Sequence, residues 1–306
     1  MRVHVLGSAA GGGFPQWNCN CDNCARLRAG SLVGRPRTQS SLCVQGLAGP
    51  DWALVNASPD ILSQIRATPE LQPGRARRDS GIAGVILSDA QVDHCTGLLM
   101  LRESTRPLPL WCTDPVYEDL TRGNPILGVL AHYCGVERHA IPLDGSRFTL
   151  EGVPGLQLAA LPLQSKAAPY SPHREHPVPG DNIGLVFTDT ASGRSLFYAP
   201  GLGERSEAVD AALRGADCVL VDGTFWTDDE MIALGLGHKT GRSIGHLPQS
   251  GRGGMLEWLA ELPQGTRKVL IHVNNSNPIL DEGSPQRAEL VSRGVEVAWD
   301  GMDIAL

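Results

Sequence analysis

The sequence lacks the features that would place the chain in a membrane or on a nucleic acid. No uninterrupted apolar run reaches the roughly 18 residues that a membrane-spanning helix needs. Asp and Glu outnumber Lys and Arg, 33 to 26, and the net charge of -7 gives no basic excess for a nucleic-acid partner. No basic stretch leads into an apolar segment after Met1, so no export signal is visible. We therefore expect a cytoplasmic protein.

Internal repeats and low-complexity tracts are also absent. Apolar residues make up 42% of the chain and charged residues 19%, which is typical of a folded protein with a sizeable core. A length of 306 residues exceeds most single domains, although α/β sandwiches often reach it. We expect one domain over residues 1–306, and the sequence leaves open whether it forms a homo-oligomer.

Short apolar segments alternate with helical patterns along the chain, which predicts an α/β fold. IGLVFTD, a turn at TASGRS and LFYAPG together predict a hairpin, and TGLLMLRE has a helical pattern. Two long segments, 163–182 and 224–251, fit neither pattern and are rich in Gly, Pro and polar residues. Loops of this length inside compact domains are often functional, so we expect these two loops to form the rim of a site.

Polar residues follow three apolar strand-like segments. Asp93 and His94 come after VILSDAQV, Asp222 after CVLV, and His272 after KVLI. Burial without a partner is costly for a carboxylate or an imidazole. Taken singly, Asp222 would more often cap a turn and His272 would more often be a hydrogen-bonded core residue. Four such residues in this order favour convergence on a metal ion.

Three of the eight cysteines, Cys19, Cys21 and Cys24, are clustered in CNCDNC. In a reducing compartment, thiolates this close together are typical of a tetrahedral structural zinc site, which we place in the loop at about residues 17–26. The fourth ligand is missing locally. A histidine such as His246 or an oxygen donor remains open, and His246, in SIGHLPQ of the second long loop, could instead act as an acid, a base or an active-site ligand.

The strand-end residues, in this order, resemble the metallo-β-lactamase fold, an αββα sandwich of two mixed sheets with outer helices. Hydrolases of that fold often carry T-H-x-H-x-D-H, whereas SDAQVDH has Asp89 and Gln91 in place of its first two histidines. CNCDNC, RTQSSL, SDAQVDHCTGLL, DGTFW, GHLPQ and IHVNNSNPIL together closely resemble the coenzyme pyrroloquinoline quinone (PQQ) synthesis protein B family, over the whole length of the chain.

That resemblance implies a role for each residue of the site. Asp93, His94, Asp222 and His272 would hold the metal, while Asp89 and Gln91 would support these ligands or position substrate. His246 would transfer protons. Two imidazoles with a carboxylate and open positions are chemically close to non-haem Fe(II) oxygenase sites, although the same ligands also accept other divalent metals.

The implied reaction is hydroxylation, by O₂, of the tyrosine-derived ring in a cross-linked glutamate–tyrosine precursor of PQQ. Such a substrate carries several carboxylates, so Arg35 and Arg37 in GRPRTQSSL are candidate substrate-binding residues. Two alternatives remain: a carrier of PQQ or its precursor, and a hydrolase that uses a single metal ion. The depleted metal motif makes a two-metal hydrolase the less favoured interpretation.

Overall fold

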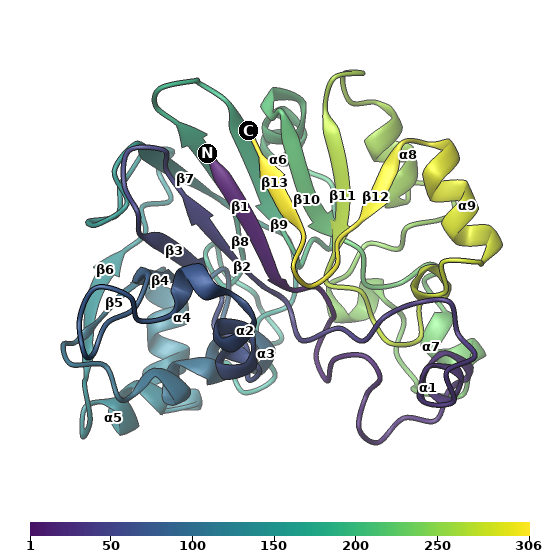
Figure 1. Ribbon diagram of the computed structural model, residues 1–306. Helices are drawn as coiled ribbons and strands as arrows, with labels where there is room; N and C mark the ends of the chain where they lie inside the picture. Colours follow the sequence, from purple (N-terminus) through teal and green to yellow (C-terminus); the bar gives the residue numbers. More distant parts are fainter.

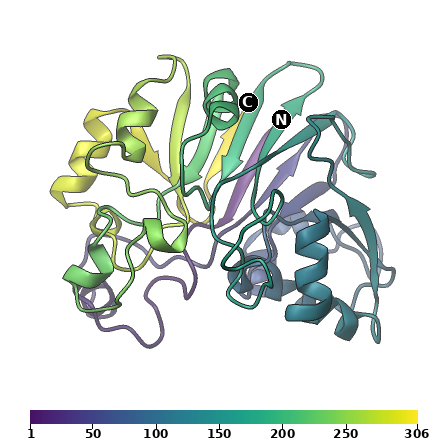
Figure 2. The same ribbon diagram turned by 180° about the vertical axis from the view of Figure 1, so that it is seen from behind.

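The computed structural model describes residues 1–306 as two β-sheets that face each other, with helices on both outer surfaces (Figures 1 and 2). The first sheet has the order β13-β1-β2-β3-β4-β5-β6 and the second β12-β11-β10-β9-β8-β7. Each sheet contains parallel and antiparallel pairs: β3 to β6 run parallel, as do β9 to β12. The predicted αββα sandwich of two mixed sheets is confirmed.

Thirteen strands form the two sheets. The first sheet consists of β13 (Asp303–Ala305), β1 (Arg2–Gly7), β2 (Ser41–Gln45), β3 (Trp52–Val55), β4 (Ile82–Ile86), β5 (Leu108–Cys112) and β6 (Val136–Ala140). The second consists of β12 (Val295–Val297), β11 (Arg267–Ile271), β10 (Cys218–Asp222), β9 (Ser195–Ala199), β8 (Ile183–Asp189) and β7 (Leu156–Pro162).

Nine α-helices and five turns of 3₁₀ or π type connect the strands. The α-helices are α1 (Asp22–Arg28), α2 (Ile61–Ala67), α3 (Val92–Cys95), α4 (Asp114–Glu118), α5 (Ile126–Leu130), α6 (Glu207–Gly215), α7 (Glu230–Ala233), α8 (Met255–Ala260) and α9 (Pro285–Ser292). The shorter turns are Pro69–Leu71, Thr96–Leu101, Arg242–Ile244 and Pro278–Leu280, of 3₁₀ type, and Asp119–Gly123, a π-turn. None of the helices is both long and apolar enough to cross a membrane.

The alternation of side chains along the strands builds three apolar layers. In β10, Cys218 and Leu220 contribute to the core between the two sheets, whereas Val219 and Val221 pack with the helices outside the second sheet. This is the two-residue period of a strand buried on both faces. The layer outside the first sheet is filled by side chains from α2 to α5, such as Ile61 of α2.

Most of the expected elements are present, with some differences in type. The predicted hairpin is β8 and β9, which pair antiparallel. TGLLMLRE contains a 3₁₀ turn over Thr96–Leu101 in place of an α-helix, and Gly97 lets this turn pack directly on the segment before α2, since a Cβ there would come 2.2 Å from the backbone oxygen of Ser58. The last strand, β13, has only three residues and shows no sequence pattern of its own.

Candidate metal centre

The ends of one strand in the first sheet and two in the second bring the predicted residues to one edge of the sandwich. Asp89 and α3 follow β4 in the first sheet, while Asp222 ends β10 and His272 follows β11 in the second. Strands β10 and β11 are parallel and adjacent, with Asp222 opposite Ile271. Polar groups at the carboxyl ends of parallel strands meet at one edge, where open α/β sheets bind their ligands.

Asp89 fixes the orientation of His94. Both carboxylate oxygens of Asp89 lie 2.8 Å from His94 Nδ1. The hydroxyl of Ser88 and the backbone N–H of Gln91 donate to the same carboxylate, at 2.8 and 2.9 Å. A carboxylate held this way keeps the proton of a neutral imidazole on Nδ1 and leaves the Nε2 lone pair free, as in carboxylate–histidine–metal triads.

The Nε2 atom of His94 is buried and has no hydrogen-bond partner. It lies 3.8 Å from Asp93 Oδ2, which in turn lies 3.2 Å from His272 Nε2. Ligand atoms about 2.0–2.2 Å from a shared metal ion are separated by roughly 3–3.6 Å, so this spacing fits a divalent cation. An orphaned buried nitrogen would gain the partner it lacks. Asp93, His94 and His272 therefore fit a metal site.

A second group, Asp222 with His246, adjoins the first through His272. Asp222 Oδ2 lies 2.6 Å from His246 Nδ1 and accepts the backbone N–H of Leu202 at 2.9 Å. The rings of His246 and His272 stack, with centroids 5.3 Å apart. The structure thus brings Asp222 and His246 beside the first three residues, and His246 belongs to this centre and not to the cysteine cluster.

Thr224 connects the two histidines. Its hydroxyl lies 2.9 Å from His272 Nδ1 and 3.1 Å from His246 Nδ1, and it donates to the backbone oxygen of His272 at 3.0 Å. A hydroxyl that donates to this carbonyl can accept the proton of His272 Nδ1, which leaves Nε2 of His272 facing Asp93. His272 itself has φ 61°, a left-handed conformation that this carbonyl contact helps to hold.

The centre concentrates negative charge in a buried place. Burial by itself lowers the pKa of His94, but the charges of Asp89 and Asp93 outweigh it and raise this pKa to about 9. Burial opposes protonation of His246 as well, yet the charge of Asp222 raises its pKa. Three buried carboxylates in one centre thus attract positive charge, which a divalent cation would supply in place of protons.

Gln91 links the metal motif to the first long loop. Its side-chain amide donates to the backbone oxygen of Lys166 at 3.3 Å, and the amide of Asn182 donates to the same oxygen at 3.2 Å. Asn182 also pairs with Asp89 through a backbone bridge. Both ends of the 163–182 loop are therefore held against the turn that carries Asp89 and Gln91.

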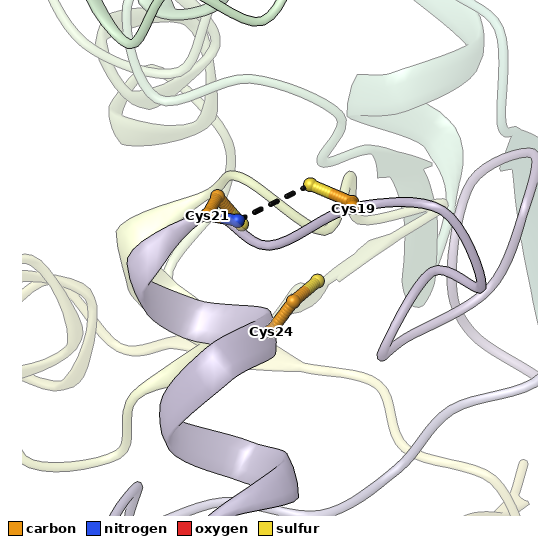
Figure 3. Close-up of side chains that lie close together, drawn as sticks. All are labelled: Cys19, Cys21 and Cys24. Carbon is orange, nitrogen blue, oxygen red and sulfur yellow. Dashed lines mark hydrogen bonds between the residues drawn. The ribbon is translucent and has the colours of Figure 1, made fainter.

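The three clustered cysteines lie together at the start of α1 (Figure 3). The sulfur atoms of Cys19, Cys21 and Cys24 lie within 4.8 Å of one another, and Figure 3 shows their side chains facing a common point. The side-chain amide of Asn275 faces the same point, with Nδ2 at 3.1 Å from the sulfur of Cys19 and 3.4 Å from that of Cys24. If the amide were turned by 180°, its oxygen would complete a four-coordinate zinc site.

The two arginines proposed for substrate binding contact protein groups. Arg37 is buried and donates to the hydroxyl of Ser8 at 3.0 Å and to the backbone oxygen of Ala298. The guanidinium of Arg35 lies over the ring of Trp299, 5.6 Å from its centroid. Neither residue contacts the metal-centre side chains, and a substrate role for either stays a prediction.

Sequence patterns did not reveal Thr224 or Asn275. Each lies in an irregular segment after a strand, and each acquires its partners only when distant segments meet: Thr224 contacts His272, 48 positions away, and Asn275 contacts Cys19, 256 positions away. An unusually polar run, IHVNNSN, was the one sequence signal near Asn275.

Comparison with known proteins identifies the family. The model of the beta-lactamase superfamily domain matches residues 51–273. The coenzyme PQQ synthesis protein B of Azoarcus sp. (strain BH72) is 66% identical over the full length of both chains, and that of Methylobacillus flagellatus is 59% identical, also over both full lengths.

Solved structures agree with the sequence comparison. Zn²⁺-bound PqqB from Methylobacterium extorquens matches over the full length of both chains with a TM-score of 0.90 and 38% identity. A diphosphatase of the PhnP family has a TM-score of 0.69 at 17% identity, covering 100% of this chain and 97% of the other, and shares the fold. The chain therefore belongs to the coenzyme PQQ synthesis protein B family of the metallo-β-lactamase superfamily.

Proposed function

We propose that this protein acts in PQQ biosynthesis as an Fe(II)-dependent hydroxylase of the tyrosine-derived ring in a cross-linked glutamate–tyrosine precursor. Full-length identity of 66% to a coenzyme PQQ synthesis protein B supports the pathway. One observation carries the reaction class. Both residues that replace the histidines of the hydrolase motif are hydrogen-bonded within the protein: Asp89 to His94, and Gln91 to the backbone of Lys166. Neither is left to serve a second metal ion.

The residues present fit one metal ion with open positions. His94 and His272 would supply two imidazole nitrogens, and Asp93 a carboxylate oxygen, with Asp222 next to this group. When bound in such a set, Fe(II) supplies activation of O₂, with open coordination positions for O₂ and substrate. The PqqB structure from Methylobacterium extorquens contains Zn²⁺, which the same types of ligand accept.

The chain's own residues have separate tasks in this proposal. Asp89 and Thr224 hold the imidazoles of His94 and His272 with Nε2 inward. His246 keeps a proton on Nδ1 for Asp222, so its Nε2 is the atom that can exchange a proton with the ring hydroxyl of the substrate. The Gly-rich loop after β1, residues 8–13, packs directly against the site, since a Cβ on Gly11 would come 3.4 Å from Asp93 Oδ2.

Oxygen insertion tests the proposal directly. Protein loaded with Fe(II) under anaerobic conditions is mixed with the cross-linked precursor, a reductant and ¹⁸O₂, and the product is analysed by mass spectrometry. We expect a product that has gained ¹⁸O, only with Fe(II), and none from His94→Ala or His272→Ala. Unchanged precursor that stays tightly bound would favour the carrier, and cleavage of the precursor with Zn²⁺ and no O₂ would favour a hydrolase.

A further inference from the structure

A cavity of about 510 Å³ lies between the two long loops. The 163–182 loop lines it with Ser165 and Lys166, the 224–251 loop with Arg242 and Gly245, and the segment after β9 with Gly203 and Glu204. A larger cavity of about 630 Å³ lies at the amino-terminal ends of β4 and β5, at the opposite end of β4 from Asp89 and α3.

Two glycines let the segments that line the cavity approach one another closely. A Cβ on Gly203 would come 2.7 Å from the backbone oxygen of Gln164, and one on Gly245 would come 2.4 Å from the hydroxyl of Ser165. Gly245 also has φ +95°, which strains any other residue. The hydroxyl of Ser165 donates to the backbone oxygen of Gly245 at 2.9 Å, so the loops are joined at the base of the cavity.

The charged side chains that line the cavity form no ion pairs within the protein. No ion pair includes Lys166, Glu204 or Arg242, although the structure contains many ion pairs elsewhere. The guanidinium of Arg242 makes one contact, at 3.3 Å, with the backbone oxygen of Gly253. Two cations and one anion are thus available to a ligand.

Lys166 has a fixed place relative to the metal centre. Its backbone oxygen accepts the amides of Gln91 and Asn182, and Gln91 is two residues from Asp93. Gly245 precedes His246 in the opposite wall. One wall of the cavity is thus hydrogen-bonded to the motif that contains Asp93 and His94, and the opposite wall is continuous in the chain with His246. Because that motif is rich in carboxylates, an anionic ligand needs cations such as Lys166 to be retained.

We infer that this cavity binds an α-amino-acid end of the substrate, with its carboxylate on Lys166 and Arg242 and its ammonium on Glu204. The inference rests on the proposed function, since the glutamate–tyrosine precursor carries such ends. In this arrangement Gln91, which stands where hydrolases have a metal-binding histidine, holds the backbone of Lys166 and so positions its side chain for the carboxylate. A cavity of this size matches ordinary small-molecule sites.

Binding to Zn²⁺-loaded protein tests the inference without any turnover. The probes are the free cross-linked precursor and its methyl esters, which lack the carboxylate charges, and the Kd of each is measured by calorimetry. For Lys166→Met we expect the Kd of the free acid to rise about tenfold, the size of one charge-assisted contact at a partly exposed site, and the Kd of the esters to change little. Lys166→Arg restores most of the affinity.

Lys239→Met is the matched control, because Lys239 lies in the 224–251 loop, is exposed and does not line the cavity. Zinc content and Tm are compared for all variants. An unchanged Kd for Lys166→Met, or an equal loss for acid and esters, overturns the inference. Normal, Lys166-dependent binding together with no ¹⁸O insertion by the Fe(II) protein would overturn the hydroxylase and leave the binding site in place.

Discussion

Asp89 occupies a position where hydrolases of this fold have a metal ligand, and here it is hydrogen-bonded to His94, which we propose as a ligand. Its two oxygens contact the Nδ1 of His94, and a full carboxylate is needed to favour the Nδ1–H tautomer. For Asp89→Asn we expect divalent-metal affinity to fall by about 10- to 100-fold, the usual effect of losing such a partner. Competition with a chromogenic chelator measures it.

A matched carboxylate–histidine pair provides the control. Asp303 lies 2.8 Å from His4 Nδ1 on the exposed face of β13, far in the fold from the strand-end residues. Asp303→Asn should leave metal affinity unchanged. Equal affinities for wild type and Asp89→Asn would show that His94 finds its orientation without the carboxylate.

Thr224 has a single hydroxyl in contact with two histidines. Thr224→Val keeps the shape and removes this hydroxyl, so the Nδ1 proton of His272 loses its acceptor. We expect the ¹⁵N imidazole NMR signals of His272 to shift toward a mixture of tautomers, with metal affinity lowered about tenfold. Thr224→Ser, which keeps the hydroxyl, should behave as wild type. A His272 tautomer that is the same in the valine variant would contradict this role.

At the scale of elements, the cysteine cluster joins α1 to the segment after β11. The amide of Asn23 in α1 donates to the backbone oxygens of Asn275 and Asn277, at 3.1 and 2.9 Å, and Cys24 is fully buried. Figures 1 and 2 both show α1 beside α7, and Ser276 connects the same segment to Glu230 of α7. A zinc ion here would link α1 and the loop before it to the segment after β11, which Ser276 in turn connects to α7.

Removing one thiolate should loosen the contact between α1 and the segment after β11. For Cys24→Ser we expect one zinc ion fewer per chain and an unfolding free energy lower by about 2 kcal/mol or more, because a structural metal and a buried side chain are both affected. Elemental analysis and urea denaturation measure the two effects. Cys134→Ser, at a half-buried cysteine outside the cluster, should retain the zinc. Full zinc content in Cys24→Ser would exclude Cys24 as a ligand.

Sequence patterns predict the elements with a regular apolar repeat and the ionisable residues that end them. Asp222 and His272 were found because each ends a buried apolar strand, and parallel strands place such ends together. Thr224 was not found because a threonine in a loop has no pattern. The contact of Arg37 with Ser8 is set by tertiary packing, which no local sequence pattern contains, and its substrate role stays a prediction.

At the scale of the whole molecule, both long loops and the Gly-rich loop meet at one edge of the sandwich, while the sheets supply a rigid base. The core between the sheets contains fully buried residues from both, such as Val44 and Phe187. Polar groups that are costly to bury are concentrated at this edge, where a metal ion and substrate can satisfy them. A buried acid outside this edge has no metal ion or substrate to satisfy it. We therefore expect the free energy of unfolding to depend on pH through such acids.

Glu230 is the clearest of these acids. Burial raises the pKa of its carboxyl to about 7, despite hydrogen bonds from Ser276 and the backbone N–H of Trp226. A raised folded-state pKa means that its contribution is complete below pH 4.5 and is lost as pH rises through 7. For Glu230→Gln, which resembles the protonated acid, we expect a gain of up to roughly 3 kcal/mol over wild type at pH 8 and little difference near pH 5.

Urea denaturation of wild type and Glu230→Gln at both pH values, with the metal content held constant, measures this difference. Glu151→Gln is the control, because Glu151 is exposed and makes no hydrogen bond or ion pair, so its effect should be small and independent of pH. A gain for Glu230→Gln of the same size at pH 5 and pH 8 would mean that the amide improves packing alone. A gain in unfolding free energy at pH 8 alone would show that the buried, ionised carboxylate of Glu230 destabilises the wild-type protein.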